Sequence, residues 1–386
     1  MSADLPLDAD RLMQDAAGRA GSDDFGPGDF REGLETLLEA YTRAGLHEAG
    51  TKTTYKRLRD LLMNRVAIQR TLQARPEIQD RTLRSPLYLT GLPRTGTSAL
   101  FNLLGSDPAA RPLLFWETKF PTPFDGSLPD SGEDPRLTAL RDGIDRARAK
   151  SPAFSQIHDL RADGPEEGVG LLAHTFQSVM MGIEPLLPPY DAYFQSRDQQ
   201  PIYAYYIDLL RMLDAERPGD RWLLKSPCHL WALDVIVAEL PDACIVQTHR
   251  NPLEAIPSYC SMMEAIMAIR ESVDRATLGP TVLEYLARSL EAGIAARDTL
   301  DSSRIFDVDY RRFVSDPEPV VRELYQHFGF ELPPETVSAM GEHATTHGKD
   351  RHGKHEYTLE MYGLTGAMVR DRLAAYIERF GLPAAL

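Results

Sequence analysis

The loop GLPRTGTS at residues 91–98 has the residue types and the spacing of a phosphate-binding site. Gly91 and Gly96 are separated by four residues, as the two glycines of a P-loop are. The lysine that would follow Gly96 in a Walker-type nucleotide hydrolase is replaced by Thr97. Because that lysine and Mg²⁺ together offset the charge of the β- and γ-phosphates, its loss predicts a phosphate site without metal-assisted hydrolysis of a nucleoside triphosphate.

Arg250 and Ser258 form a second set of groups suited to an anion. Arg250 follows the strand-like run 243–248, and Ser258 lies eight residues later on a helix that Asn251 and Pro252 begin. A guanidinium group offers a planar fork to a phosphate dianion, and a serine hydroxyl adds one donor. We expect the two side chains to hold a phosphate; an exposed arginine and an unrelated helical serine are the alternative.

Lys225 and His229 are candidates for chemistry on a transferred group. Lys225 ends the strand-like run 222–225, and the carboxyl end of a parallel strand faces the ligand edge of its sheet. A lysine there can stabilise charge on the transferring group and its bridging oxygen. His229 could exchange a proton with an acceptor, or it could simply cap the helix that follows.

Alternating strands and helices would position these groups. From residue 85 onward, strand-like runs alternate with helical periodicity, which is typical of a doubly wound parallel sheet. The sequence therefore predicts an α/β fold, with a P-loop-like parallel sheet flanked by helices. The expected strands are 86–90, 222–225, 243–248 and 304–310, and the expected helices are 98–105, 230–240, 318–328 and one that begins at 252.

Three other regions show no catalytic pattern. Residues 1–80 are predicted to be a helical N-terminal region, with helices at about 29–44 and 51–74. We expect this region to pack on the core or on a second subunit, which leaves a homodimer open. Residues 121–150 are rich in Pro, Asp and Gly and are expected to form an exposed excursion. Residues 151–218 return to helical periodicity with many large apolar side chains, a pattern more typical of core than of a pocket.

Composition limits the partners and the compartment. The chain has 386 residues and a formal net charge of −15, which argues against a nucleic-acid partner. We find no run of about 18 apolar residues and expect no integral membrane segment. The three cysteines lack CxxC spacing, and the N-terminus lacks the pattern of a signal peptide. Reduced thiols and a cytoplasmic location are therefore expected.

Three segments, in this order, resemble the nucleotide-binding segments and the catalytic lysine strand of sulfotransferases. They are GLPRTGTSALFNLL, RWLLKSPCHL and THRNPLEAIPSY. The chain is similar to the bacterial and actinobacterial branch, which is related to the tyrosylprotein sulfotransferases and uses 3′-phosphoadenosine 5′-phosphosulfate (PAPS). The resemblance begins near residue 85. It implies a sulfotransferase α/β domain at 81–386, in which 151–218 form a helical lid on the acceptor side.

The resemblance also assigns roles to the candidate residues. The glycine loop would hold the 5′-phosphosulfate, and Arg250 with Ser258 would hold the 3′-phosphate. Arg94 and Lys225 would stabilise the bridging oxygen as the sulfuryl group leaves, with no metal expected. The residues expected to contact PAPS are Pro93, Arg94, Thr95, Gly96, Thr97, Ser98, Arg250, Ser258, Lys354 and Tyr357.

Two residues are candidates for the base that takes a proton from the attacking hydroxyl. Glu117 follows the first helix of the domain, where related enzymes carry a catalytic glutamate, and burial is expected to raise its pKa. His229 lies closer to the lysine, but its spacing from Lys225 differs from the Lys-x-His of cytosolic sulfotransferases. We favour Glu117; a salt bridge that only shapes the loop is its alternative role.

The acceptor is expected to be the hydroxyl group of a small, largely apolar molecule. The large side chains of 151–218 could line an apolar pocket for it, although a carbohydrate acceptor is an alternative. Two other functions compete with sulfuryl transfer. A P-loop kinase or NTPase lacks support because the Walker lysine is absent, and a non-catalytic nucleotide-binding module would not need the candidate catalytic groups.

Overall fold

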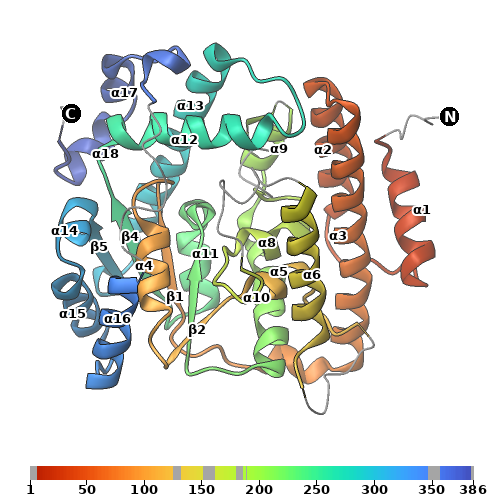
Figure 1. Cartoon of the computed structure of the whole chain (residues 1–386), viewed down its shortest axis with the longest axis horizontal. Helices are drawn as coiled ribbons and strands as arrows, with labels where there is room; N and C mark the ends of the chain where they lie inside the picture. Colours follow the sequence, from red (N-terminus) through yellow and green to blue (C-terminus); the bar gives the residue numbers. More distant parts are fainter. Residues whose placement is uncertain are drawn as a thin grey trace.

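A parallel sheet lies at the centre of the fold (Figure 1). The computed structural model describes residues 7–124, 132–150, 161–179, 186–187, 189–346 and 357–383. Within these residues the sheet has five strands, in the order β2-β3-β1-β4-β5, and each neighbouring pair is parallel. The strands are β1 (Leu87–Gly91), β2 (Ala110–Pro112), β3 (Arg221–Lys225), β4 (Cys244–His249) and β5 (Ile305–Asp309). The carboxyl ends of β1, β3 and β4 therefore meet at one edge of the sheet.

Helices cover both faces of the sheet and extend the molecule to one side (Figure 1). The α-helices of the described residues are α1 (Ala9–Ala20), α2 (Phe30–Ala44), α3 (Glu48–Ala74), α4 (Thr97–Leu104), α5 (Phe115–Lys119), α6 (Pro135–Lys150), α8 (Val169–Leu172), α9 (Tyr190–Gln195), α10 (Gln199–Glu216), α11 (Leu233–Glu239), α12 (Pro252–Met267), α13 (Arg275–Arg297), α14 (Tyr310–Ser315), α15 (Pro317–Phe328), α16 (Pro334–Thr346), α17 (Gly366–Arg372) and α18 (Ala374–Arg379). Short 3₁₀ turns are η1 (Pro76–Asp80), η2 (Ala173–Thr175), η4 (Pro227–Trp231), η5 (Ser302–Arg304) and η6 (Glu360–Tyr362).

The central strand β1 packs against a different hydrophobic cluster on each face. Leu87 and Leu89 belong to a cluster that includes apolar residues of α4 and α15. Tyr88 belongs to a larger cluster together with Leu224 and Ile245, its neighbours on β3 and β4. A strand buried on both faces reads as a continuous apolar run, which is why the sequence predicts β1 correctly.

The N-terminal helices share this larger cluster. α1, α2 and α3 stand on one side of the molecule (Figure 1), and Leu34 and Leu58 belong to the same cluster as Tyr88 of β1. The helices predicted at 29–44 and 51–74 are confirmed as α2 and α3. The expectation that the first 80 residues pack on the core therefore holds within the described residues.

The structure corrects two expectations about individual elements. Residues 121–150 are not simply an exposed excursion, because α6 occupies the second half of this segment. Its Arg136 is 1% exposed and pairs with Asp134 and with Glu216 of α10, which ties the helix to the body. The helix expected at 230–240 is divided into η4 and α11, since Pro227 begins a tight turn that the Ser226 hydroxyl caps.

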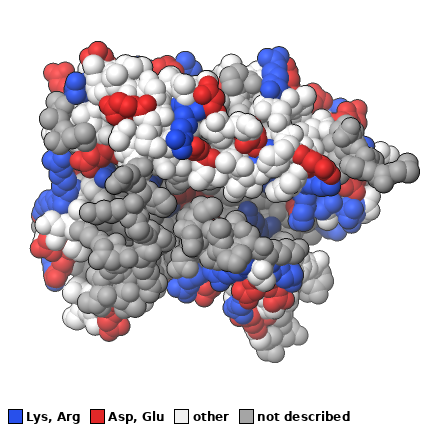
Figure 2. All heavy atoms as spheres, turned by 45° about the horizontal axis from the view of Figure 1, so that its top comes forward, with Lys and Arg blue, Asp and Glu red and all other residues white. Residues whose placement is uncertain are grey.

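Surface charge is mixed on the face that Figure 2 shows. Lys and Arg side chains alternate with Asp and Glu over the coloured part of that surface. An anionic co-substrate therefore requires a local site with its own positive groups, rather than a broad positive face.

Candidate active site

The loop at 91–98 is held in place by close backbone packing at the end of β1. Gly91 has φ +132°, and a Cβ atom there would lie 2.6 Å from the carbonyl oxygen of Thr248 on β4. Gly96 has φ +88°, and its Cβ would lie 2.8 Å from the ring of Tyr310. Both positions require glycine, because a side chain would meet strain and a neighbour at once. The sheet and α14 therefore set the shape of the loop.

Thr95 stabilises the loop from inside. Its hydroxyl donates to the carbonyl oxygen of Leu92 at 2.6 Å and lies 2.6 Å from the hydroxyl oxygen of Thr248. Thr95 and Pro93 are buried. The Thr95 hydroxyl is therefore used within the loop, and a contact of Thr95 with an anionic ligand would come from its main-chain N–H.

The N-terminus of α4, the end of β3 and a glutamate meet beside the loop. Gly96 caps α4 without a side-chain acceptor, which leaves the N–H groups of the first turn open to an anion. Thr97 is buried and Ser98 is exposed. The Lys225 ammonium lies 3.2 Å from the Ser98 hydroxyl oxygen and forms an ion pair with the Glu167 carboxylate. A cation, a hydroxyl and a carboxylate thus adjoin the anion-binding end of α4.

Glu167 was not assigned a catalytic role from the sequence. The N–H of the next residue, Gly168, donates to the carbonyl oxygen of Lys225 at 2.9 Å, which joins this segment to the end of β3. The Glu167 side chain is 31% exposed, whereas that of Lys225 is 5% exposed. The carboxylate is therefore accessible from solvent while its partner is not. The available signal was a pair of acidic residues before an apolar run, and only the fold brings it to Lys225.

Arg94, Ser258 and Arg250 gather on the other side of the loop. The Nε of Arg94 donates to the Ser258 hydroxyl at 2.9 Å. An Nη1 hydrogen of Arg250 is donated to the main-chain oxygen of Arg94 at 2.9 Å. Arg94 has φ +68°, which is uncommon for a residue with a side chain. The structure thus brings together the three residues that the sequence placed around the phosphates.

Arg250 is oriented by its surroundings. Its guanidinium pairs with Glu254, one turn along α12, at 2.9 Å and stacks over the ring of Tyr310 at 4.4 Å. Pro257 lies inside α12 and removes one backbone donor next to Ser258. These contacts hold the guanidinium beside the loop.

The two C-terminal candidates are less informative. Lys354 lies outside the described residues. Tyr357 is partly buried and packs against the larger hydrophobic cluster. Their contact with the nucleotide stays a prediction.

The environment of Glu117 corrects the expected pKa shift. Its carboxylate is 1% exposed and accepts two hydrogen bonds from Arg111, both at 2.7 Å, and two from Arg217, at 3.1 and 3.2 Å. The main-chain N–H of Leu114 donates to it as well. Burial alone would raise its pKa, but the two arginines outweigh burial and lower it. The expectation of a raised pKa is wrong, and the alternative of a salt bridge that shapes the chain describes the contacts seen.

His229 lies near Lys225 in a closed environment. It is fully buried in η4, and its Nδ1 lies 2.9 Å from the hydroxyl of Tyr203. Burial, and then the charge of Lys225, lowers its pKa to about 3. The ring is therefore neutral and a poor proton acceptor at neutral pH. It does not cap α11, because Ala232 occupies that position.

The comparison with known proteins agrees with this arrangement. The family model described as the sulfotransferase family matches residues 86–334. The chain belongs to the sulfotransferase family. The matched segment contains the glycine loop, Lys225, Arg250 and Ser258.

Two solved bacterial sulfotransferases share the fold. STF1 from Mycobacterium tuberculosis H37Rv is 33% identical over 95% of this chain and 98% of its own, with a TM-score of 0.82. STF9 from Mycobacterium avium is 26% identical over 99% of each chain, with a TM-score of 0.87. Both matches cover the N-terminal helices as well as the α/β part. The P-loop-like α/β fold expected from the sequence is confirmed.

A curated relative is named for its substrate. The omega-hydroxy-beta-dihydromenaquinone-9 sulfotransferase Stf3, from Mycobacterium bovis and Mycobacterium tuberculosis, is 24% identical over 166 residues. The match spans 41% of this sulfotransferase and 40% of the relative. No helix among the described residues is long and apolar enough to cross a membrane.

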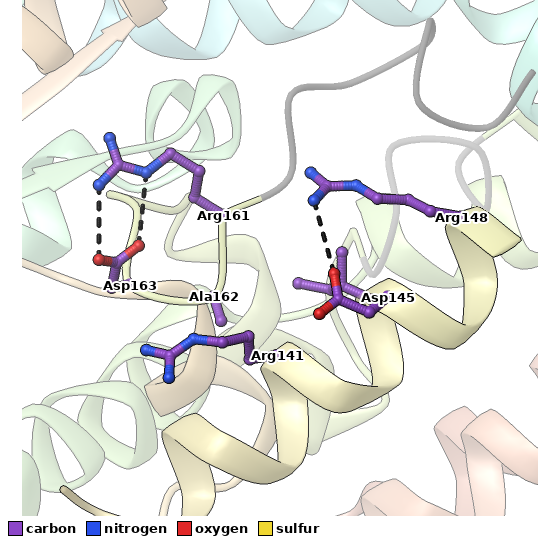
Figure 3. A pocket seen from close by; sticks show the side chains of 7 residues that line it. Arg141, Asp145, Arg148, Arg161, Ala162 and Asp163 are labelled. Atoms are coloured by element: carbon purple, nitrogen blue, oxygen red, sulfur yellow. Dashed lines mark hydrogen bonds and ion pairs between the residues drawn. The ribbon is translucent and has the colours of Figure 1, made fainter. Parts of the chain in front are cut away.

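A small cavity lies between α6 and residues 161–163 (Figure 3). It has a volume of about 160 Å³. Arg161 pairs with Asp163 across it, and Arg148 approaches Asp145 at 3.8 Å. Its lining has three arginines and two aspartates, and none of its lining residues belongs to the candidate site. We assign the cavity no part in the reaction.

Proposed function

We propose that this sulfotransferase transfers a sulfuryl group from PAPS to the hydroxyl of a largely apolar small molecule. The observation that carries the proposal is the placement of Lys225 between Ser98 and Glu167, beside the open first turn of α4. Lys225 can stabilise the developing negative charge, and Glu167 can accept the proton.

The donor fits the two groups of positive and polar side chains. The main chain of the loop and the start of α4 would hold the 5′-phosphosulfate. Arg250 and Ser258 would hold the 3′-phosphate, and their link to the loop through Arg94 keeps the two anion sites together. A second phosphate site of this kind distinguishes PAPS from a nucleoside diphosphate or triphosphate.

The reaction would follow in-line displacement at sulfur. The acceptor oxygen forms a bond to sulfur while the bond from sulfur to the bridging phosphate oxygen breaks. Lys225 and Arg94 would stabilise the charge on that bridging oxygen. The hydroxyl proton passes to Glu167, and the products are a sulfate ester and 3′-phosphoadenosine 5′-phosphate.

Glu167 is preferred to the two residues proposed from the sequence. Its carboxylate is partly exposed and paired with Lys225, so an acceptor can reach it beside the cation. Two arginines occupy the Glu117 carboxylate, and the pKa of His229 is too low for a base at neutral pH.

An apolar acceptor is supported mainly by the named substrate of the relative Stf3, a hydroxylated dihydromenaquinone. The large side chains of 151–218 named below give no support for an apolar pocket, because they belong to the core, as their pattern predicts. Phe176, Tyr190, Tyr203 and Tyr206 are buried in the main core. We retain a reduced cytoplasmic setting as part of the proposal, since Cys228, Cys244 and Cys260 are buried and form no disulfide with one another.

Calorimetric titration without metal tests the donor. We expect 3′-phosphoadenosine 5′-phosphate to bind more tightly than ADP to the wild type. Arg250→Ala should remove most of this preference and leave ADP binding little changed. Equal affinity of the wild type for both nucleotides would contradict the donor assignment, and a strict Mg²⁺ requirement would favour a P-loop kinase.

A further inference from the structure

The N-terminal helix α3 contacts the segment that carries Glu167. Asn64 on α3 is half-buried, and its Nδ2 lies 3.0 Å from the carbonyl oxygen of Lys119 and 3.1 Å from Nε2 of His174 in η2. The Nδ1 of His174 lies 3.0 Å from the carbonyl oxygen of Leu171. Because a carbonyl only accepts, Nδ1 holds the ring proton and Nε2 offers a lone pair to Asn64. Burial lowers the pKa of His174 to about 4, which keeps the ring neutral.

Asn64 therefore uses both hydrogens of its amide nitrogen to join two segments of the chain. One goes to the end of α5 and the other to η2. Asparagine is the only uncharged side chain of its size that has two N–H donors on one atom. The contact requires an amide donor, which is a chemical requirement rather than one of packing.

The far end of this connection is Glu167. α8 continues directly into η2, and Glu167 lies two residues before α8 begins. Gly168, the residue after Glu167, is itself held by its hydrogen bond to the carbonyl oxygen of Lys225. A Cβ on Gly170 would lie 2.7 Å from Cβ of Thr118, so α8 already lies against α5. A displacement of η2 would therefore be transmitted along α8 to Glu167.

A buried arginine holds the same turn in place. Arg65 is 1% exposed and donates to the carbonyl oxygens of His174, Phe25 and Pro27 at 2.8, 2.9 and 2.6 Å. Its guanidinium also lies over the ring of Phe30 at 4.1 Å. Removal of this group would leave several main-chain oxygens unpaired and destabilise the fold, so Arg65 is an anchor and is unsuitable as a test of catalysis.

We propose that Asn64 is a positioning residue, which fixes the carboxylate of Glu167 against Lys225 through η2 and α8. The inference rests on the proposed role of Glu167 in proton transfer. It gives the N-terminal helix α3 a part in the reaction through the segments that it contacts, η2 and the end of α5.

The isosteric change Asn64→Asp tests this role. It keeps the volume of the side chain but replaces both donated hydrogen bonds with contacts between acceptors. We expect kcat for sulfuryl transfer to fall on the order of 10- to 100-fold, because a displacement of about 1 Å near the reacting atoms has effects of this size. The affinity for 3′-phosphoadenosine 5′-phosphate should not change. Asn64→Ser, which keeps one donor, should lose less of kcat.

Gln73→Glu is the matched control. Gln73 lies on the same helix and donates to Asp24 at 3.0 Å, but it does not contact η2. This variant undergoes the same change from amide to carboxylate and should keep the wild-type kcat. An equal loss of kcat in both variants, or a parallel loss of nucleotide affinity in Asn64→Asp and Asn64→Ser, would overturn the positioning role. Failure of the proposed function would show differently, as a wild type without PAPS-dependent transfer.

Discussion

Two glutamates in neighbouring segments show how surroundings decide the role of a residue. Glu117 is enclosed by Arg111 and Arg217, and these contacts stabilise its charged form so strongly that it is a poor proton acceptor. Glu167 has a lysine on one side and solvent on the other. The same side chain therefore serves as a structural ion pair in one place and is suited to catalysis in the other.

Substitution of each glutamate by glutamine should separate these roles. Glu167→Gln should reduce kcat on the order of 10²- to 10⁴-fold, the usual contribution of a general base, with a smaller loss of stability than Glu117→Gln because the Glu167 carboxylate is partly exposed. Glu117→Gln should instead lower the free energy of unfolding by about 3–5 kcal/mol, because it breaks a buried ion pair. Steady-state kinetics and chemical denaturation check both. A severe kinetic defect in a stable Glu117→Gln protein would reverse the assignment.

The buried side chain of His229 predicts that stability depends on pH. The pKa of His229 in the folded protein is about 3, well below about 6.5 in an unfolded chain. The unfolded state therefore binds a proton that the folded state rejects. Stability is fully present above about pH 6.5 and is lost as the pH falls below that value.

The variant His229→Phe cannot bind this proton. Between pH 7 and pH 5 the wild type should lose about 2 kcal/mol more of unfolding free energy than the variant loses. Urea denaturation at the two pH values measures the difference. Identical pH dependence in the two proteins would show that His229 does not contribute.

At the scale of elements, the sequence predicts the parts of the fold that follow simple patterns. β1, β3 and β4 contain short apolar runs, β5 alternates apolar residues with aspartate, and each lies where it was expected. β2 was missed, because three residues that include Arg111 and Pro112 do not form an apolar run. α1 and α6 were missed as well, and contacts distant in sequence stabilise them.

The candidate site was predictable only where its residues lie in motifs. The glycine loop, Lys225, Arg250 and Ser258 stand at strand ends or on the helix that follows, so their meeting follows from a parallel sheet. Glu167 lies in the segment before α8, whose sequence shows no helical or strand periodicity. Its approach to Lys225 depends on a backbone hydrogen bond across 57 positions of sequence, from Gly168 to Lys225, which no local rule indicates.

The loop between β1 and α4 should tolerate no side chain at Gly91. Gly91→Ala combines a positive φ with a close approach to a carbonyl oxygen of β4. Gly329→Ala is the matched control, since Gly329 has φ +69° and nothing within 4 Å of its would-be Cβ. The free energy of unfolding of the control should fall by about 1–2 kcal/mol from backbone strain alone. Gly91→Ala should lose clearly more of its free energy of unfolding, as measured by calorimetry. An equal loss in the two variants would show that the close approach to the carbonyl oxygen of β4 is unimportant.

At the scale of the whole molecule, one hydrophobic cluster extends from the N-terminal helices to the sheet. Leu34 and Leu58 belong to it together with Tyr88 and Leu224. The division into residues 1–80 and 81–386 therefore describes sequence regions, and we propose that it does not describe independently folding units.

Removal of residues 1–80 tests this view. The shortened chain would expose the apolar surface that α2 and α3 cover, including Phe176, which adopts φ +55° beneath them. We expect aggregation or the loss of cooperative unfolding, visible by light scattering and near-ultraviolet circular dichroism. A shortened chain that unfolds cooperatively as a monomer would show that the α/β part folds alone.

The order of strands also has a consequence for synthesis on the ribosome. β1 lies between β3 and β4, yet about 130 residues separate its end from the start of β3. At a synthesis rate of roughly 5–20 residues per second, roughly 7–26 s pass between the synthesis of β1 and that of its neighbour β3. During that interval an apolar strand with two unpaired edges is present in the nascent chain. We therefore expect the chain to depend on chaperones that bind emerging polypeptides, and its yield of folded protein to fall when they are depleted.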